Sequence, residues 1–456
     1  MSQFSSIGSA EDLKNPDYLP PLAKAIPLGI QHILAMFISN VTPAIIVCGA
    51  AGFGFGSSSP DFPNMIYMIQ MSMFFAGIAT LIQTIGIGPI GAKLPIVQGT
   101  SFAFVPIMVP LVAGKGVDAI AILMGGVIIG GLFHTILGVF IGRIRFALPP
   151  LVTGLIILMI GLALIRVGIQ YAAGGVPAKA QGLPEYGSLM NWSIAGVVIV
   201  VTLVLKFFTR GMLSVAAVLI GIIAGYIVAY FNGMVNFGNV GNAAAIALPN
   251  PFHFGVEFTA AAIIGFCAMS FVSAVETVGD VSGITKGGAN REATDKEIEG
   301  ATYADGIGSA VAGVFGGLPN TSFSQNVGLI AMTGVMSRHV VTIGALLLVI
   351  AGLIPKVGAI IATIPIEVLG GGVIVMFGMV SAAGVSMLAT VTWNKRNLII
   401  FAIALSVGLG LQLEPDALQH MSGTAQVLMV SGLLPAAVIA IVLNLILPES
   451  IGEAAE

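Results

Sequence analysis

The chain has 456 residues, of which 57% are hydrophobic and only 8% are charged, and its mean hydropathy is +1.04. Soluble domains carry about a quarter charged residues, so this composition excludes a soluble protein and predicts a polytopic membrane protein. The net charge of -3 and the lack of a basic run argue against nucleic acid as a partner. Cys48 and Cys267 lie in apolar stretches, which favours buried hydrophobes over a disulfide framework.

Hydrophobic stretches long enough to cross a bilayer recur along the chain. A spanning helix needs about 20 mainly apolar residues. Residues 1–20 are polar and contain no signal-peptide pattern, so the first span is expected to direct insertion. Twelve clear spans and two short ones, interrupted by Gly, Pro and hydroxyl residues, predict fourteen crossings. They are expected at 24–50, 65–86, 95–112 (short), 118–142, 149–168, 190–207, 212–230, 256–280, 300–316, 321–335 (short), 339–354, 366–388, 397–412 and 425–447.

The basic residues test the predicted number of spans, because cytoplasmic loops are enriched in Lys and Arg. With the N-terminus inside, only four of the 17 basic residues fall outside: Lys115, Arg166, Lys179 and Lys356. The inside set is Lys14, Lys24, Lys93, Arg143, Arg145, Lys206, Arg210, Lys286, Arg291, Lys296, Arg338, Lys395 and Arg396. A miscounted span would reverse the later loops, so the bias supports fourteen spans with both termini cytoplasmic.

The two halves of the chain resemble each other. The tripeptide Thr-Ser-Phe at 100–102 recurs at 321–323, shortly after a Leu-Pro in both copies. A second echo pairs Pro149 with Pro365, Gly154 with Gly370 and Gly168 with Gly384. Both offsets link span n with span n+7, and because seven is odd the halves enter the membrane from opposite sides. The pattern predicts an inverted repeat, whose paired broken spans indicate the midplane site of a secondary transporter.

Few ionisable residues lie inside the predicted spans, where they are costly and often functional. Glu276 and Asp280 are four residues apart, so they share one face of a helix. A carboxyl group taken out of water holds a proton more readily, which a proton-coupled carrier requires. Asp280 is also consistent with a helix end at the surface, Asp305 with a buried structural hydrogen bond, and His32 with a satisfied core histidine. His134 is interpreted as structural.

Several motifs together resemble one family. The segment QNVGLIAMTG (325–334) fits the signature of the nucleobase-ascorbate transporters (nucleobase:cation symporter family 2), with Gln325, Asn326, Gly328 and Thr333 at its defining positions. QHILAMF in the first span, LIQ and QGTSF around the third, SAVETVGD in the eighth and ADG in the ninth are also similar to that family. The resemblance covers essentially the whole chain and is strongest to the bacterial xanthine and urate permeases.

The resemblance implies an all-α membrane protein of seven plus seven inverted spans. Spans 3 and 10 would each combine a short strand with a half-helix. It implies cytoplasmic tails at 1–23 and 448–456, a core domain at 24–142 and 256–358, and a gate domain at 143–255 and 359–447. Such proteins are homodimers of the inner membrane that work by an elevator-like motion.

The resemblance also implies roles for individual residues. Glu276 would be the substrate-binding carboxylate and Gln325 the second ligand, with Asn326, Ser322, Phe102 and Ser101 around them. The residues that would support the site or couple the proton are Asp305, His32, Asp280 and Thr333. No metal site, cofactor or enzyme is predicted, because no metal spacing, phosphate loop or nucleophile–base pattern stands out.

Substrate chemistry agrees with a purine. A carboxylate accepts from two N–H groups at once, an amide both donates and accepts, and an aromatic ring covers a flat base. The expected function is import of xanthine, urate or both by proton symport, with sodium as the less favoured ion. Gln325 stands where uracil carriers have Glu. Ser101 stands where strict xanthine permeases often have Asn, so urate is kept as a substrate. A symporter for uracil or another nucleobase is the first alternative. An anion carrier of the same fold and a passive channel are the others.

Overall fold

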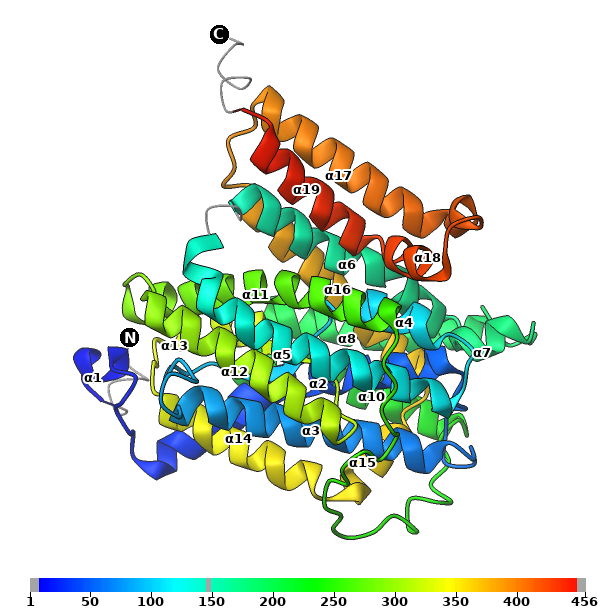
Figure 1. The fold of residues 1–456 in the computed structure, drawn as a ribbon. Helices are drawn as coiled ribbons and strands as arrows, with labels where there is room; N and C mark the ends of the chain where they lie inside the picture. The colour runs from blue at the N-terminus through cyan, green and yellow to red at the C-terminus, as the bar shows by residue number, and fades with distance from the viewer. Residues whose placement is uncertain (1–7, 145–148, 449–456) are drawn as a thin grey trace.

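A computed structural model describes residues 8–144 and 149–448 of this chain. The fold is almost entirely helical, with one short sheet (Figure 1). Arg145, counted above among the cytoplasmic cations, lies outside the described residues, as do residues 1–7 of the N-terminal tail and 449–456 of the C-terminal tail.

The elements of the first half end at residue 231. They are α1 (Ala10–Lys14), α2 (Leu22–Ala51), α3 (Phe62–Ile85), β1 (Gln98–Thr100), α4 (Val105–Val112), the 3-10 helix η1 (Val117–Ala119), α5 (Ile120–Ile144), α6 (Pro150–Ala172), α7 (Gly175–Ala180), α8 (Leu189–Phe208), α9 (Met212–Val215) and α10 (Ala217–Phe231).

The elements of the second half follow a long connection at 232–259. They are α11 (Ala260–Ala289), α12 (Asp295–Val314), β2 (Asn320–Ser322), α13 (Ser324–Thr333), α14 (Arg338–Gly352), α15 (Pro355–Ala362), α16 (Ile366–Leu388), α17 (Lys395–Leu413), the 3-10 helix η3 (Pro415–Leu418), α18 (Gly423–Val430) and α19 (Leu433–Ile446).

Each predicted span coincides with one or more of these helices, but not all are long single helices. Within the described residues, eight helices are long and apolar enough to cross a membrane, or up to ten if each bent pair forms one span. The bent pairs are α14 with α15, at 80°, and α18 with α19, at 81°. The stretch 425–447, predicted as one helix, is therefore interrupted. The number of fourteen crossings stays a prediction.

The two short segments predicted to be broken meet at the centre of the fold. Strands β1 and β2 pair antiparallel, with Gln98 opposite Ser322 and Thr100 opposite Asn320. Two backbone hydrogen bonds extend the pairing, from Ser101 N to Pro319 O (2.8 Å) and from Phe323 N to Val97 O (3.0 Å). Each strand leads into a short helix, α4 or α13, so both helices begin close to the sheet. The backbone N–H and C=O groups of these non-helical segments thus find hydrogen-bond partners inside the protein. A segment within a bilayer requires this, because lipid offers no such partners.

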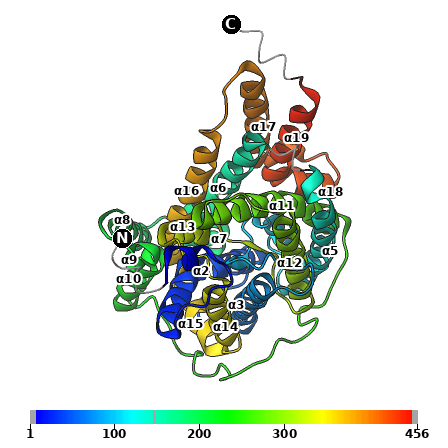
Figure 2. The ribbon, with the colours of Figure 1, turned by 90° about the vertical axis from the view of Figure 1, so that its left-hand side faces the viewer.

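The helices pack in two groups. Helices α2, α3 and α5 pack with α11, α12 and α14, whereas α6, α8 and α10 pack with α16. The pair α17 and α19 lies against α6, at the far side of the molecule from α14 and α15 (Figure 2). Helix α11 also contacts α6, α18 and α19, so it borders both groups.

Glycines allow the repeat-related helices α6 and α16 to approach closely. A Cβ added at Gly384 would lie 2.9 Å from the carbonyl oxygen of Gly154. One added at Gly161 would lie 2.7 Å from the backbone nitrogen of Ser381, and one at Gly370 would lie 2.1 Å from that of Ala172. Small residues at such contacts let the two backbones approach closely. The resulting van der Waals packing stabilises helix association in lipid, where the hydrophobic effect does not drive it.

This contact gives a stability prediction. In Gly370→Ala the new methyl meets backbone atoms that cannot rotate away, so we expect overpacking to cost roughly 1–3 kcal/mol. The measurement is the thermal unfolding midpoint of the purified protein in detergent. Gly378→Ala on the same helix is the control, because nothing lies within 4 Å of its added Cβ. Equal midpoints for the two variants would contradict the close-contact explanation.

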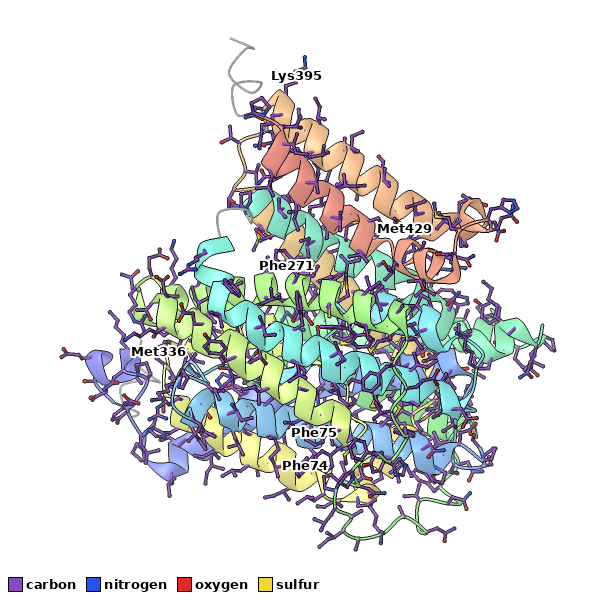
Figure 3. The ribbon with its side chains drawn as sticks, viewed as in Figure 1. Phe74, Phe75, Phe271, Met336, Lys395 and Met429 are labelled. Carbon is purple, nitrogen blue, oxygen red and sulfur yellow. The ribbon has the colours of Figure 1, made fainter. Side chains whose placement is uncertain are left out.

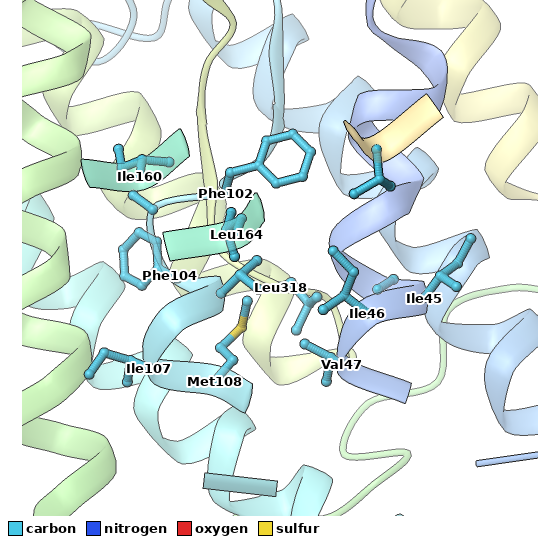
Figure 4. Close-up of a cluster of buried hydrophobic side chains, with 14 of the residues drawn as sticks. Ile45, Ile46, Val47, Phe102, Phe104, Ile107, Met108, Ile160, Leu164 and Leu318 are labelled. Atoms are coloured by element: carbon cyan, nitrogen blue, oxygen red, sulfur yellow. The ribbon is translucent and has the colours of Figure 1, made fainter. Parts of the chain in front are cut away.

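Apolar side chains fill the space between the two groups of helices and around the sheet. Figure 4 shows part of this core, with Phe102 beside Ile160 and with Phe104, Ile107 and Met108 nearby. Figure 3 shows the side chains of the described residues. The polar strands β1 and β2 are therefore enclosed by an apolar shell.

Candidate functional site

A small cavity of about 60 Å³ lies where the sheet meets α11, α6 and α16. Among the described residues that line it, Glu276 is the only charged one. The lining consists of Phe102, Ile157, Ile160, Glu276, Thr321, Ser322, Phe323, Ser324, Gln325, Val380 and Ala383. One wall is polar and comes from α11, β2 and the start of α13, while the other is apolar and comes from α6 and α16.

Glu276 and Gln325 are the two polar side chains with free bonding capacity at this cavity. Glu276 lies on α11 and Gln325 in the first turn of α13, and both are partly buried. Neither side chain forms a hydrogen bond or ion pair with any residue in the described part of the chain. Since buried polar groups are normally paired, a carboxylate and an amide left free side by side are suited to a ligand.

Phe102 supplies an apolar surface to the same cavity. It lies two residues after the end of β1 and is 9% exposed. Its ring packs edge-on against Phe377 of α16, with ring centroids 5.1 Å apart. The ring therefore stands between the sheet and α16 and can cover one face of a flat ligand.

Asp280 holds the junction between β2 and α13. Its two carboxylate oxygens accept hydrogen bonds from Ser322 Oγ (2.6 Å) and Ser324 Oγ (2.7 Å). Ser322 is the last residue of β2 and Ser324 the first of α13, so one buried acid on α11 fixes the turn just before Gln325. Asp280 is buried at this junction and does not end its helix at the surface.

Asp305 joins four elements and lies outside the lining of the cavity. Its Oδ1 accepts from Gln83 Nε2 (3.0 Å) and Gln98 Nε2 (2.5 Å), and its Oδ2 accepts from Thr277 Oγ1. These partners lie on α3, β1 and α11, whereas Asp305 lies on α12 and is fully buried. Since Thr277 is the neighbour of Glu276 in the chain, Asp305 fixes α11 beside the cavity as well as β1, the strand that pairs with β2.

His32 and Asn326 bind each other away from the cavity. Asn326 Nδ2 donates to His32 O (3.0 Å) and lies 3.0 Å from His32 Nδ1, and both residues are buried. This contact attaches α13 to α2. Two buried acceptors, Asn326 Oδ1 and Gln98 Oε1, have no partner among the described residues.

The remaining two predicted residues have local roles. Ser101 is fully buried and does not line the cavity; its Oγ accepts from Ala103 N (3.3 Å). Thr333 ends α13, where its Oγ1 donates to Leu329 O (2.9 Å). The structure thus brings Glu276, Gln325 and two further predicted residues together at one cavity. These two are Phe102 and Ser322. The other predicted residues do not line the cavity: Ser101, Asn326, Asp305, His32, Asp280 and Thr333.

A larger cavity of about 400 Å³ adjoins the first and shares with it Ser324, Gln325, Val380 and Ala383. It extends between α13, α2 and α16 as far as Lys206 and Ser214. Lys206 belongs to the set of cations that the charge bias placed on the cytoplasmic side. This larger cavity therefore connects the site with the part of the molecule at which Lys206 lies.

Sequence reasoning missed several residues. Gln83 and Gln98 stood within the motifs LIQ and QGTSF but were given no role, although their amides bind Asp305. A signal existed, since a glutamine in an apolar span needs a partner. Ile157, Ile160 and other apolar wall residues carried no such signal and could be found only from the fold.

Comparison with known proteins identifies the group to which this site belongs. The profile described as the permease family matches residues 23–417, most of the chain. The chain belongs to the xanthine/uracil permease family. This confirms the family resemblance of the motifs. The permease is therefore an integral membrane transporter and not an enzyme.

Named relatives match the permease over almost its full length. The xanthine permease of Bacillus subtilis is 34% identical over 428 residues, which cover 93% of each chain. The uric acid permease PucK of the same organism is 36% identical over 422 residues, covering 91% of this chain and 94% of the other. A protein of Clostridium perfringens, CPE0397, named provisionally as a purine permease, is 39% identical over 429 residues, covering 94% and 91%.

Among solved structures, the permease is similar to the transmembrane domain of the cyanobacterial bicarbonate transporter BicA. The TM-score is 0.58 at 14% sequence identity, and the match covers 93% of this chain and 97% of the other. At that identity the likeness shows the fold alone.

Proposed function

We propose that this permease imports a purine nucleobase, xanthine, urate or both, across the cytoplasmic membrane by proton symport. The observation that carries this proposal is that Glu276 and Gln325 line the same cavity and that neither side chain has a hydrogen-bond partner among the described residues. The names of the relatives, which include xanthine and uric acid permeases, support a purine as the substrate.

The two polar groups match the edge of a purine dione. Xanthine presents adjacent N–H donors and C=O acceptors, and the Glu276 carboxylate accepts from two N–H groups at once. The Gln325 amide donates to a carbonyl and accepts from an N–H. Phe102 covers a ring face, and the apolar wall of α6 and α16 excludes water from these bonds.

Transport follows from the position of the site between the two groups of helices. We assign spans 1–4 and 8–11 (24–142 and 256–358) to a core domain and spans 5–7 and 12–14 (143–255 and 359–447) to a gate domain. The core carries Glu276 and Gln325 past the apolar gate wall in an elevator motion. We interpret the larger cavity that adjoins the site and reaches Lys206 as the cytoplasmic entrance, and this conformation as inward-facing. Fourteen crossings, cytoplasmic termini and a homodimer complete the proposal.

We assign the coupling proton to the three acids of the core domain, Glu276, Asp280 and Asp305. Glu276 and Asp280 face one side of α11, and Asp305 reaches the same helix through Thr277. Within the described residues none of the three forms an ion pair with a cation, so their charge depends on bound protons. A sodium-coupled carrier is the less favoured alternative.

Two other substrates compete with purines. Uracil offers a similar pyrimidine edge, but it lacks the imidazole ring of a purine and would leave the space for that ring empty. Uracil carriers in this family also typically have Glu where Gln325 stands. A small inorganic anion would suit the fold that the chain shares with BicA. The free carboxylate of Glu276 repels such an anion, which favours the purine.

The experiment that tests the proposal is a competition panel. Uptake of radiolabelled xanthine into cells expressing the permease is measured against excess unlabelled xanthine, urate, guanine, uracil and bicarbonate. Xanthine or urate should compete strongly, and bicarbonate should not compete. Competition by uracil alone, or uptake of neither radiolabelled xanthine nor radiolabelled urate by a correctly inserted protein, would reject the purine assignment.

Ser101 is the position on which we expect the choice between xanthine and urate to depend. Ser101→Asn adds volume directly before Phe102, so urate should compete about tenfold less well relative to xanthine, the scale set by small steric differences in a pocket. Inhibition constants from the same panel measure this ratio. Ser101→Ala, which adds no volume, is the control. An unchanged ratio in a folded Ser101→Asn protein would remove Ser101 from the specificity determinants.

A further inference from the structure

The N-terminal segment predicted as a cytoplasmic tail is bound to the protein in the structure. Residues 9–18, here called the N-terminal strap, begin with the one-turn helix α1. Ser9 and Asp12 cap that helix reciprocally: Asp12 N donates to Ser9 Oγ (3.1 Å) and Ser9 N donates to Asp12 Oδ2 (3.0 Å). The strap is therefore an ordered element with its own local hydrogen bonds.

Backbone hydrogen bonds connect the strap to the linker that follows α13. Met336 N donates to Leu13 O (2.8 Å), and Arg338 N donates to Pro16 O (2.9 Å). Met336 lies at the same end of the molecule as α1 (Figures 1 and 3). The strap thus binds residues 335–338, here called the linker, which comprise the end of the connection after α13 and the first residue of α14.

Side chains strengthen this attachment. Arg338 Nε donates to Asp17 Oδ1 (2.6 Å), and Arg338 Nη1 donates to Thr84 O (2.7 Å) near the end of α3. Ser337 Oγ donates to Tyr18 O (2.5 Å). One guanidinium therefore joins the strap, the linker and α3.

Apolar packing completes the contact. Leu13 packs with a small cluster that consists of Ala25, Val335, Val340, Leu28 and Ile343. This cluster connects the strap to the linker and to the adjoining parts of α2 and α14. The contact between the strap and the linker therefore combines hydrogen bonds, an ion pair and apolar packing.

The linker ends the helix that carries Gln325. Helix α13 has only ten residues, and Gly334, with φ of 69°, closes it. At its start, Ser324 binds Asp280, and at its end the linker binds the strap. Because so short a helix moves as a unit, a shift of its end changes the place of Gln325 at the cavity.

We propose that the N-terminal strap is a positioning element for the substrate site, which holds α13, and with it Gln325, through Arg338 and the 335–338 linker. The expected effect of the strap on substrate affinity rests on the proposed function, in which Gln325 is a substrate ligand. The expected effect of the strap on the local stability of α13 is independent of that function. The segment α4, which is the repeat counterpart of α13, shares no hydrogen bond and no hydrophobic cluster with the strap within the described residues, and it serves as an internal reference.

The test uses the full-length double variant Leu13→Ala/Asp17→Asn, which removes the apolar contact and the ion pair with Arg338. Hydrogen–deuterium exchange is followed by mass spectrometry in peptides covering 324–336 and 98–112. Xanthine affinity is measured on the same preparations. Glu11→Gln is the matched control, because it removes one negative charge from the strap at a side chain with no partner among the described residues. Asp17→Glu, in the wild-type Leu13 background, tests whether a carboxylate suffices.

We expect exchange in 324–336 to become at least about fivefold faster in the double variant, with no change in 98–112. Xanthine affinity should fall about three- to tenfold, since an exposed ion pair and one apolar contact are lost. Glu11→Gln and Asp17→Glu should behave like the wild type. Unchanged exchange in 324–336, or an equal rise in 98–112, would overturn the proposal. If the wild type bound neither xanthine nor urate, the proposed function would fail, while the exchange data would still decide the role of the strap.

Discussion

Glu276→Gln should weaken purine binding by at least about 100-fold and abolish uptake. The carboxylate offers two acceptors to adjacent N–H groups, whereas the amide turns an NH₂ donor toward one of them. Each hydrogen bond to a charged group is worth about 1.5–3 kcal/mol, and 1.4 kcal/mol is a factor of ten. The measurement is the dissociation constant of xanthine for the purified protein, obtained by isothermal titration calorimetry.

Glu257→Gln is the matched control, because Glu257 is exposed on the loop before α11 and does not line the cavity. It should bind xanthine like the wild type. The thermal midpoint of Glu276→Gln should also stay at or above the wild-type value, since Glu276 forms no bond with the described residues that would be lost. Normal binding in a folded Glu276→Gln protein would refute the assignment of Glu276.

Asp305→Ala should destabilise the whole core group of helices. It removes the acceptor shared by Gln83, Gln98 and Thr277, and Gln98 then has no remaining side-chain bond. A buried group left unpaired costs about 1–3 kcal/mol, so losing this junction should cost roughly 2–4 kcal/mol in total. The measurement is the thermal midpoint in detergent, together with xanthine uptake, which should disappear.

Asp305→Asn separates the hydrogen-bonding role from the charge. Its side-chain oxygen still accepts from the two glutamines, and its amide can donate to Thr277, so stability should fall by less than half as much as in Asp305→Ala. Uptake driven by a proton gradient should still be lost, because Asn cannot exchange a proton. A stable Asp305→Ala protein with a wild-type midpoint would show that the junction is not structural.

The parts of the fold that could be predicted are those encoded by sequence length and pattern. Apolar stretches of about 20 residues indicated helices such as α2 and α6, and the Thr-Ser-Phe repeat indicated that 95–112 and 321–335 are broken segments, where the structure has β1 with α4 and β2 with α13. The bend between α18 and α19 left no hydropathy signal. It occurs at Gly432, with φ of 67°, inside a continuous apolar run.

The site could be predicted where a residue type was out of place in an apolar span. Glu276 and Asp305 stood out for that reason, and the family resemblance added Gln325. Distances between spans were not accessible, so the sequence did not separate Gln325, which lines the cavity, from Asn326, which binds His32 behind it. The strap was missed because a short polar segment before the first span gives no sign of what it contacts.

The most direct test of purine symport is accumulation of radiolabelled xanthine by proteoliposomes that contain only the purified permease. With an acidic exterior and a more alkaline interior, xanthine should concentrate inside above its external level, and a protonophore should return it to equilibrium. Equilibration without concentration would indicate a passive channel. Accumulation that persists with the protonophore present would contradict proton coupling.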